Sequence, residues 1–343
     1  MLSKVTRKTV YFLLLLTLVT LILGSGLVIG INNVSKGRIV YTKNIYGQFE
    51  GIYIMDPDGN NVNRIPMACI SHPISPVWSP DGQWIAFGCR TGKLEQNLCI
   101  LDQEGRTTSG ILTNGADCYS YNGLIDIRSV STEFCSAAIE SVSWAPDGQR
   151  LAFTCPHQNQ SGALTCIVDL DGTILNCWPL SLVVGIDTKR NGTTSVAWSS
   201  VTDQLALSFV AQDTTKSGIY LTSIDGKSAT FLTQGHNPRW SPRGNQLAFV
   251  LTGICIIDTD GKNLYCPYDR SKSSTVTGDW EALPNFFGGY VSWSPNGHSL
   301  VFSAGQTSSG SPTAIYTLDI RKNVIHQITN SYDGLFEYLD WSP

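Results

Sequence analysis

The sequence has few charged residues, few histidines and no closely spaced cysteine pair. Charged side chains make up 15% of its 343 residues, and the formal net charge is −4. There is no basic stripe with interleaved aromatic residues, so we expect no nucleic-acid partner. No Cys-x-x-Cys pair occurs among the ten cysteines, which argues against a zinc site of that type. The absence of a Gly-x-Ser-x-Gly motif argues against a hydrolase with a nucleophile elbow.

One motif recurs along the chain. Its clearest copy runs from Trp78 to Phe87 as Trp-Ser-Pro-Asp-Gly-Gln-Trp-Ile-Ala-Phe. Asp-Gly between two apolar runs is a strong β-hairpin signal, because glycine adopts the positive φ that the turn needs. The other copies, one of which lacks its Pro-Asp-Gly and the last of which stops after Pro, begin 42–66 residues apart at Trp144, Trp198, Trp240, Trp293 and Trp341.

Each period also contains a third apolar strand, often ending in Asp, and most contain a fourth. In the second period we place the fourth strand at Ile111–Thr113. Four strands that recur six times at this spacing predict an all-β fold, a six-bladed β-propeller of four-stranded blades. One tryptophan at the same place in every blade indicates core packing rather than a binding stripe.

The first and last strands of the repeat complete each other. Residues 37–42 resemble a second strand that no Trp-Ser-Pro precedes, and residues 337–341 resemble a first strand that no Ile-Ala-Phe follows. We therefore expect the two termini to share one blade. Such closure of the ring removes exposed sheet edges that would otherwise promote aggregation.

The segment before the propeller predicts a membrane anchor. A basic segment, residues 1–9, precedes residues 10–31, which carry no charged side chain. This run is long enough to cross a bilayer as a helix, although Gly24-Ser25-Gly26 could serve as a cleavage site. We predict an uncleaved single-pass signal anchor with its N-terminus inside, a short tether at residues 32–36, and the propeller at residues 37–343 outside the cytoplasm.

The cysteines predict disulfides in an oxidising compartment, since their number is even and the chain carries an export signal. The offsets of the cysteines within the repeat favour the pairs Cys69–Cys89, Cys99–Cys118, Cys135–Cys155, Cys166–Cys177 and Cys255–Cys266. A competing scheme contains Cys89–Cys99, Cys155–Cys166, Cys118–Cys135 and Cys69–Cys177.

Two long connections, residues 114–138 and 267–288, carry aromatic side chains and join a fourth strand to the next first strand. Loops of this length are usually functional. Because the anchor leads directly into a second strand, we expect the turns between first and second strands to face the membrane. The long loops and one channel mouth then face outward, with candidate binding residues Tyr119, Tyr121, His72, His236, Trp280 and Phe287.

The Trp-Ser-Pro-Asp-Gly-x-x-Ile-Ala-Phe motif, with Ile-Tyr-x-x-Asp-x-Asp-Gly, resembles the TolB-type, WD-repeat-like propeller family over about residues 37–343. The resemblance implies the six-bladed fold. It also implies a non-enzymatic binding or scaffold module, because relatives include periplasmic scaffolds that bind partner proteins. The chain lacks the N-terminal α/β domain of TolB, which argues against a Tol–Pal role.

Two functions follow as hypotheses. The first is a membrane-anchored module that binds a protein, or a glycan, on its outward face without a cofactor. The second is a metal-assisted carbohydrate-active enzyme, a lyase or glycosidase, that uses the channel mouth. His72 and His236 fall near that mouth, with His157 on the same face, but five histidines scattered over the chain favour chance placement.

Overall fold

The propeller forms one compact unit in the computed structural model. Gly37–Pro343 separates from Met1–Lys36, which contains the predicted anchor and lies outside the described residues. No helix in the part of the chain that the structure describes is long and apolar enough to cross a membrane. The described residues are 37–45, 48–66, 71–91, 95–107, 110–111, 124–125, 135, 139–157, 162–179, 194–211, 213–269, 277–278, 289–305, 313–330 and 334–343.

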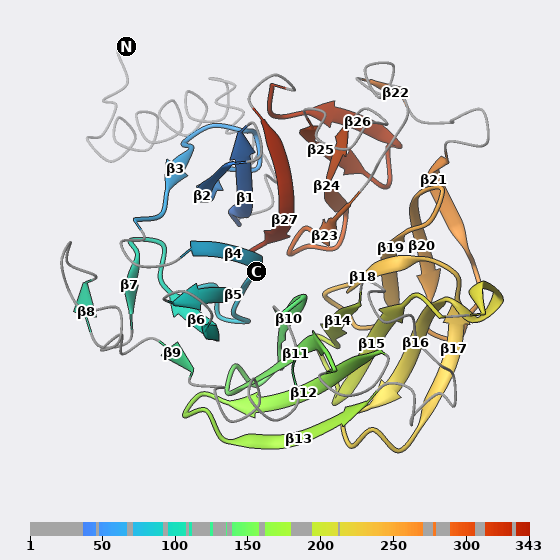
Figure 1. The fold of residues 1–343 in the computed structure, drawn as a ribbon. Helices are drawn as coiled ribbons and strands as arrows, with labels where there is room; N and C mark the ends of the chain where they lie inside the picture. Colours follow the sequence, from blue (N-terminus) through green and yellow to red (C-terminus); the bar gives the residue numbers. More distant parts are fainter. Residues whose placement is uncertain are drawn as a thin grey trace, which may run out of the picture. The chain divides into compact units, whose positions relative to one another are not determined.

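Within these residues, six antiparallel sheets form the blades of a ring (Figure 1), as predicted. In the first three blades, from the centre outward, the strands are β27 (Leu335–Trp341), β1 (Ile39–Ile45), β2 (Gln48–Met55) and β3 (Asn63–Arg64); β4 (Ser71–Trp78), β5 (Ile85–Thr91), β6 (Glu95–Leu101) and β9 (Leu124–Ile125); and β10 (Ser141–Trp144), β11 (Arg150–Pro156), β12 (Ala163–Asp169) and β13 (Ile174–Pro179).

The last three blades repeat this order. They contain β14 (Ser195–Trp198), β15 (Gln204–Phe209), β16 (Gly218–Ser223) and β17 (Ala229–Thr233); β18 (His236–Trp240), β19 (Gln246–Val250), β20 (Gly253–Asp258) and β21 (Tyr265–Asp269); and β23 (Val291–Trp293), β24 (Ser299–Gly305), β25 (Thr313–Asp319) and β26 (Val324–Gln327). A short strand, β22 (Thr277–Gly278), adds parallel to β26.

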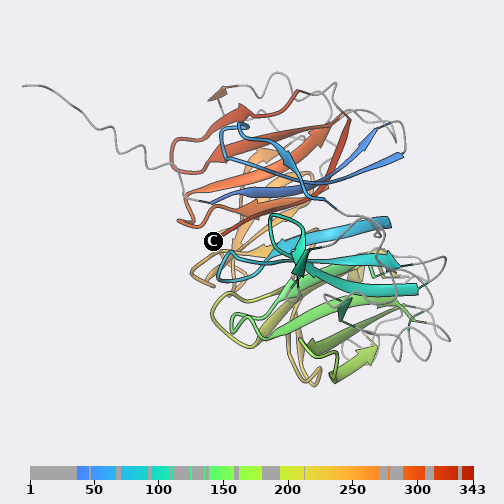
Figure 2. The ribbon, with the colours of Figure 1, turned by 90° about the vertical axis from the view of Figure 1, so that its left-hand side faces the viewer.

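The two ends of the propeller share the first blade. β27 pairs antiparallel with β1, with Ile39 opposite Trp341. The Arg38 N–H donates to Ser342 Oγ at 2.7 Å, and the Ser342 N–H donates to the Arg38 carbonyl at 2.8 Å. Figure 2 shows the ring from the side, with the C-terminus at one of its two faces. The predicted closure is confirmed.

The repeated motif builds both the turn and the core of a blade. In the second blade, Ser79 Oγ accepts the Trp84 N–H at 2.9 Å, and Gly82 has the positive φ of +68° that the turn requires. The apolar strand that follows faces the neighbouring blade. Its aromatic residue is completely buried in four blades, at Phe87, Phe153, Phe249 and Phe302. The core therefore lies between blades as well as within them.

The six motif tryptophans, all of which are described, are buried and join neighbouring blades. At three junctions the indole N–H donates to a carbonyl of the preceding blade: Trp144 to Val77 at 3.2 Å, Trp240 to Ala197 at 3.0 Å and Trp293 to Arg239 at 3.0 Å. At the other three, the backbone N–H donates to a side chain of the preceding blade: Trp78 to Asp340 at 2.9 Å, Trp198 to Ser143 at 2.9 Å and Trp341 to Ser292 at 3.2 Å. The interpretation of these tryptophans as core residues is confirmed.

The second blade differs from the prediction in its fourth strand. Ile111 lies in β8 (Gly110–Ile111), which forms a small hairpin with β7 (Arg106–Thr107). The outer position of the blade belongs to β9, which pairs with Leu98 and Cys99 of β6. The prediction of Ile111–Thr113 was wrong, because a short apolar run does not show which of two nearby edges it pairs with.

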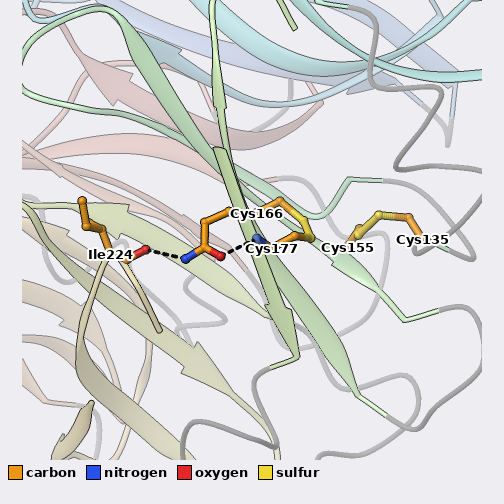
Figure 3. Close-up of a disulfide and its surroundings, with 6 residues drawn as sticks. Cys135, Cys155, Cys166, Cys177 and Ile224 are labelled. Atoms are coloured by element: carbon orange, nitrogen blue, oxygen red, sulfur yellow. Dashed lines mark hydrogen bonds between the residues drawn. A yellow bond between two sulfur atoms is a disulfide. The ribbon is translucent and has the colours of Figure 1, made fainter. Parts of the chain in front are cut away.

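The cysteines described by the structure form four disulfides. Cys135–Cys155, Cys166–Cys177 and Cys255–Cys266 have the predicted partners, and Figure 3 shows the first two. Beside Cys177, Asn176 accepts the Cys177 N–H at 3.0 Å and donates to the Ile224 carbonyl of the next blade at 3.2 Å.

The predicted pairs Cys69–Cys89 and Cys99–Cys118 were wrong, since Cys89 is bonded to Cys99. These two residues lie on adjacent strands, where Cys99 is opposite Phe87 and Cys89 is opposite Asn97. A diagonal cross-strand pair brought their sulfur atoms together, whereas the repeat rule had considered only offsets along the sequence. Cys69 and Cys118 lie outside the described residues.

Candidate functional site

A cavity of about 290 Å³ lies at the centre of the ring. It is on the face that carries the turns between first and second strands, which we call the Trp-Ser-Pro face. Its lining comes from all six blades: the motif tryptophans Trp78, Trp144, Trp198, Trp240, Trp293 and Trp341; the residue before each, Val77, Ser143, Ala197, Arg239, Ser292 and Asp340; and Pro80, Pro146, Ser200, Pro242, Pro295 and Pro343.

The residue before each tryptophan lies on the innermost strand of its blade and lines the cavity. Four of these six positions hold small or apolar residues. The two exceptions are Arg239 on β18 and Asp340 on β27, which face the same channel from blades separated by a single blade. The cavity thus combines one positive and one negative group with a largely apolar wall.

Asp340 is held in place by donors. Its Oδ1 accepts the Ser292 hydroxyl at 2.6 Å, and its Oδ2 accepts the Trp78 N–H at 2.9 Å. Burial raises the pKa of the Asp340 carboxyl, while the charge of Arg239 and these hydrogen bonds oppose that rise. Its carboxylate is therefore part of two blade junctions as well as of the channel lining.

Arg239 has far fewer partners. Its Nη1 donates to the Pro238 carbonyl at 3.1 Å, whereas its Nε is shielded from solvent and has no acceptor. Burial lowers the pKa of the Arg239 guanidinium, and the negative charge of Asp340 counteracts this. Among the described residues no carboxylate forms a salt bridge with Arg239.

Two tyrosines in contact lie close to the cavity, at the inner strands β23 and β27. The rings of Tyr290 and Tyr338 are 4.4 Å apart between centroids, and their hydroxyls are hydrogen-bonded. Burial raises the pKa of both. Tyr338 has φ +46°, as a bulge shifts the pairing of β27 with β1. Ser75 and Asn237 occupy the same position before their tryptophans and have φ +54° and +52°. Non-glycine residues in this conformation are strained and often mark functional sites.

Two of the predicted histidines belong to innermost strands, at the end away from the motif tryptophans. His236 begins β18, and His72 lies near the start of β4. Solvent reaches the His236 side chain, although the surrounding protein lowers the pKa of its imidazole. His157 forms an isolated bridge with Cys135. Among the described residues no three His, Cys, Asp or Glu side chains gather closely enough to hold a metal ion.

The remaining candidate binding residues fall outside the described part of the chain. These are Tyr119, Tyr121, Trp280 and Phe287. Sequence reasoning did not single out Arg239 and Asp340, although a signal for them was present. Both directly precede a motif tryptophan, at positions that four other blades fill with Val, Ser or Ala. A charged residue at a position that must face the propeller axis is the pattern that would have identified them.

Three partly buried carboxyls give a testable pH dependence. Burial raises the pKa of Glu140, Glu337 and Asp340 above the value in the unfolded chain. Just above pH 4, these carboxyls are therefore still protonated in the native protein but already ionised in the unfolded chain. Their contribution to stability therefore falls as the pH rises through that window. Surface carboxyls act in the opposite sense: Asp225, whose pKa is about 2 because Ser223 donates to it, stabilises the fold until the pH drops below about 4. We expect Tm to be highest at mildly acidic pH.

Thermal unfolding across the pH range tests this expectation. Glu140→Gln, which keeps an acceptor for the Thr194 N–H, should flatten the decline of Tm on the alkaline side. Asp225→Asn should change only the acid side. An alkaline decline that is identical in the Glu140→Gln variant would contradict the assignment.

Comparison with known proteins finds the fold but no sequence relative. No protein-family model and no curated protein matches the chain. Among solved structures, TolB from Acinetobacter baumannii matches with a TM-score of 0.63 and 16% identity, over 92% of this chain and 69% of that one. A chain of a nidogen/laminin complex matches at 0.59 and 11%, over 90% and 98%. A putative TolB from Agrobacterium tumefaciens matches at 0.52 and 15%, over 90% and 99%. The protein therefore has the six-bladed propeller fold found in TolB.

Proposed function

We propose that the protein is a non-enzymatic binding module outside the cytoplasm, anchored to a membrane by residues 10–31, which recognises a protein partner. The disulfides at Cys89–Cys99, Cys135–Cys155, Cys166–Cys177 and Cys255–Cys266 support an oxidising compartment. A chain from a complex of nidogen with laminin shares the fold, which supports a role in protein binding.

The observation that carries the proposal is where the chain joins the ring. A Cβ atom at Gly37 would lie 2.6 Å from the Ser342 carbonyl oxygen and 3.0 Å from Trp341 Nε1, so the propeller begins against the Trp-Ser-Pro face. Because only residues 32–36 separate the proposed anchor from Gly37, we propose that this face is the one nearer to the membrane. The connections from β9 to β10 and from β21 to β23 begin and end at the opposite face, which is left for the partner. The connection before β9, which contains Tyr119 and Tyr121, joins a third strand to a fourth, so the prediction that the whole first loop links a fourth strand to the next first strand was wrong.

The enzyme hypothesis required acidic and histidine side chains to converge at the channel mouth. In the described residues, nothing favours the lyase or glycosidase over a binding module. Glu140 is the nearest candidate for such a role, but its carboxylate accepts both the N–H and the hydroxyl of Thr194, at 2.9 and 2.5 Å. That arrangement suits a structural link between blades.

Capture from membranes tests the proposal. The anchored protein is crosslinked, the captured partner is identified and purified, and its affinity for the propeller is then measured. We expect Trp280→Ala with Phe287→Ala, both in the connection from β21 to β23, to weaken binding by at least about tenfold while Tm stays within a few degrees, because aromatic residues dominate interface energetics. Gln149→Glu, an exposed change on the Trp-Ser-Pro face, is the matched control. Loss of binding in the control alone would refute the proposed orientation.

A further inference from the structure

Arg239 places a guanidinium with open donors in the central cavity. Among the described residues, the Pro238 carbonyl is its only hydrogen-bond acceptor, and the buried Nε has none. Asp340, the other charged residue of the lining, is already engaged by Trp78 and Ser292. Arg239 is partly buried, so its guanidinium has lost part of its hydration and is stabilised by an acceptor that replaces it. We propose that this cavity binds a small α-amino or α-hydroxy acid, whose carboxylate accepts hydrogen bonds from Arg239.

The second polar contact comes from Asp340. An ionised carboxylate has about four lone-pair sites, and the Trp78 N–H and the Ser292 hydroxyl occupy two of them. The carboxylate can therefore also accept from a donor on the ligand. The amino or hydroxyl group beside the carboxylate of such an acid donates this hydrogen bond to Asp340. A single small molecule can therefore bind both Arg239 and Asp340.

The rest of the lining determines the body of the ligand. Indole rings and prolines make up most of the wall, which favours an apolar side chain. The volume of about 290 Å³ is at the lower limit of ligand pockets, which begin near roughly 300 Å³. Tyr290 and Tyr338 are not part of the lining, so the cavity ends before them.

The mouth of the cavity favours a small molecule over a loop of a partner protein. Gly37 lies against Trp341 and Pro295, both of which line the cavity, so the start of the propeller chain borders the opening. This ligand site is on the face opposite to the proposed partner surface. It goes beyond the proposed function and does not depend on it.

Calorimetric titration and thermal unfolding of the full-length protein test the proposal with three compounds of the same shape. We expect L-leucine and L-2-hydroxyisocaproate to bind and to raise Tm, and L-leucinol, which lacks the carboxylate, not to bind. Arg239→Gln should weaken binding of both acids by about 10- to 100-fold, because charge-assisted hydrogen bonds are lost. Arg243→Gln, an exposed arginine in the turn that follows, is the matched control and should bind like the wild type.

Several outcomes would overturn the proposal. One is the failure of both acids to bind the wild type, and another is equal binding of leucinol; neither measurement depends on a variant that must fold. Unchanged affinity in Arg239→Gln would place the ligand elsewhere. An acidic peptide that binds through Arg239 when neither free acid does would assign the site to a side chain of another protein. Partner capture by Arg239→Gln should remain normal, which separates this test from that of the proposed function.

Discussion

Deletion of residues 335–343 should unfold the propeller. These residues form β27, the innermost strand of the first blade, and bury the side chains of Phe336, Leu339 and Trp341. Loss of one large buried side chain costs about 3–5 kcal/mol, and a native domain has only about 5–15 kcal/mol in total. The deletion also removes the junctions with the second and sixth blades and leaves β1 with an unpaired edge. Circular dichroism and thermal unfolding of the truncated protein should show no cooperative transition.

The matched control removes Pro343 alone. This residue is exposed and follows the last paired residue, so we expect Tm to stay close to that of the intact protein. A cooperative transition of the longer deletion near the parent Tm would contradict closure of the ring by the shared blade.

Asp340→Ala should be the most destabilising single substitution in the channel. It removes the acceptor of the Trp78 N–H and the Ser292 hydroxyl, and it leaves the partly buried Arg239 without a nearby negative charge. A shielded donor left without its acceptor costs about 1–3 kcal/mol, and the substitution leaves two such donors. Each kcal/mol lowers Tm by about 2–4 °C in domains of 150–250 residues, so we expect a decrease of roughly 10 °C.

A double-mutant cycle separates charge from packing. Arg239→Met added to Asp340→Ala removes the uncompensated charge, so the double variant should recover part of the lost stability. Asp340→Asn, which preserves the shape of the side chain, should lose less than Asp340→Ala. If Arg239→Met destabilises the Asp340→Ala variant as much as it destabilises the wild type, the two charges are not coupled.

Much of the fold followed from one repeated motif. The turn at Ser79 to Trp84 needs a hydroxyl, an Asp and a glycine at fixed places, and the motif contains all three at those places. Closure was also predictable, since residues 37–42 lack the strand that residues 337–341 supply. Local turn chemistry and periodicity are the features that a sequence expresses most directly.

The disulfides and the channel were harder to predict because they depend on register and direction. Cys89 and Cys99 meet diagonally across β5 and β6, and a shift of one residue in that pairing would separate them. Tyr338 has its positive φ at a bulge between β27 and β1, and no residue type in that strand predicts the bulge. Arg239 and Asp340 could have been identified by asking which position of each blade lines the channel. That question can be asked only after the ring of blades has been assumed.

The position of β1 in its blade also determines how the propeller bears mechanical load. β1 lies between β27 and β2 and is hydrogen-bonded to both. A force applied at Gly37 along β1 must shear the hydrogen bonds to both neighbouring strands together. If the chain joined at an outer strand instead, that strand could separate from its single neighbour one hydrogen bond at a time. The shared blade therefore places the most force-resistant geometry at the point where the chain leaves the ring.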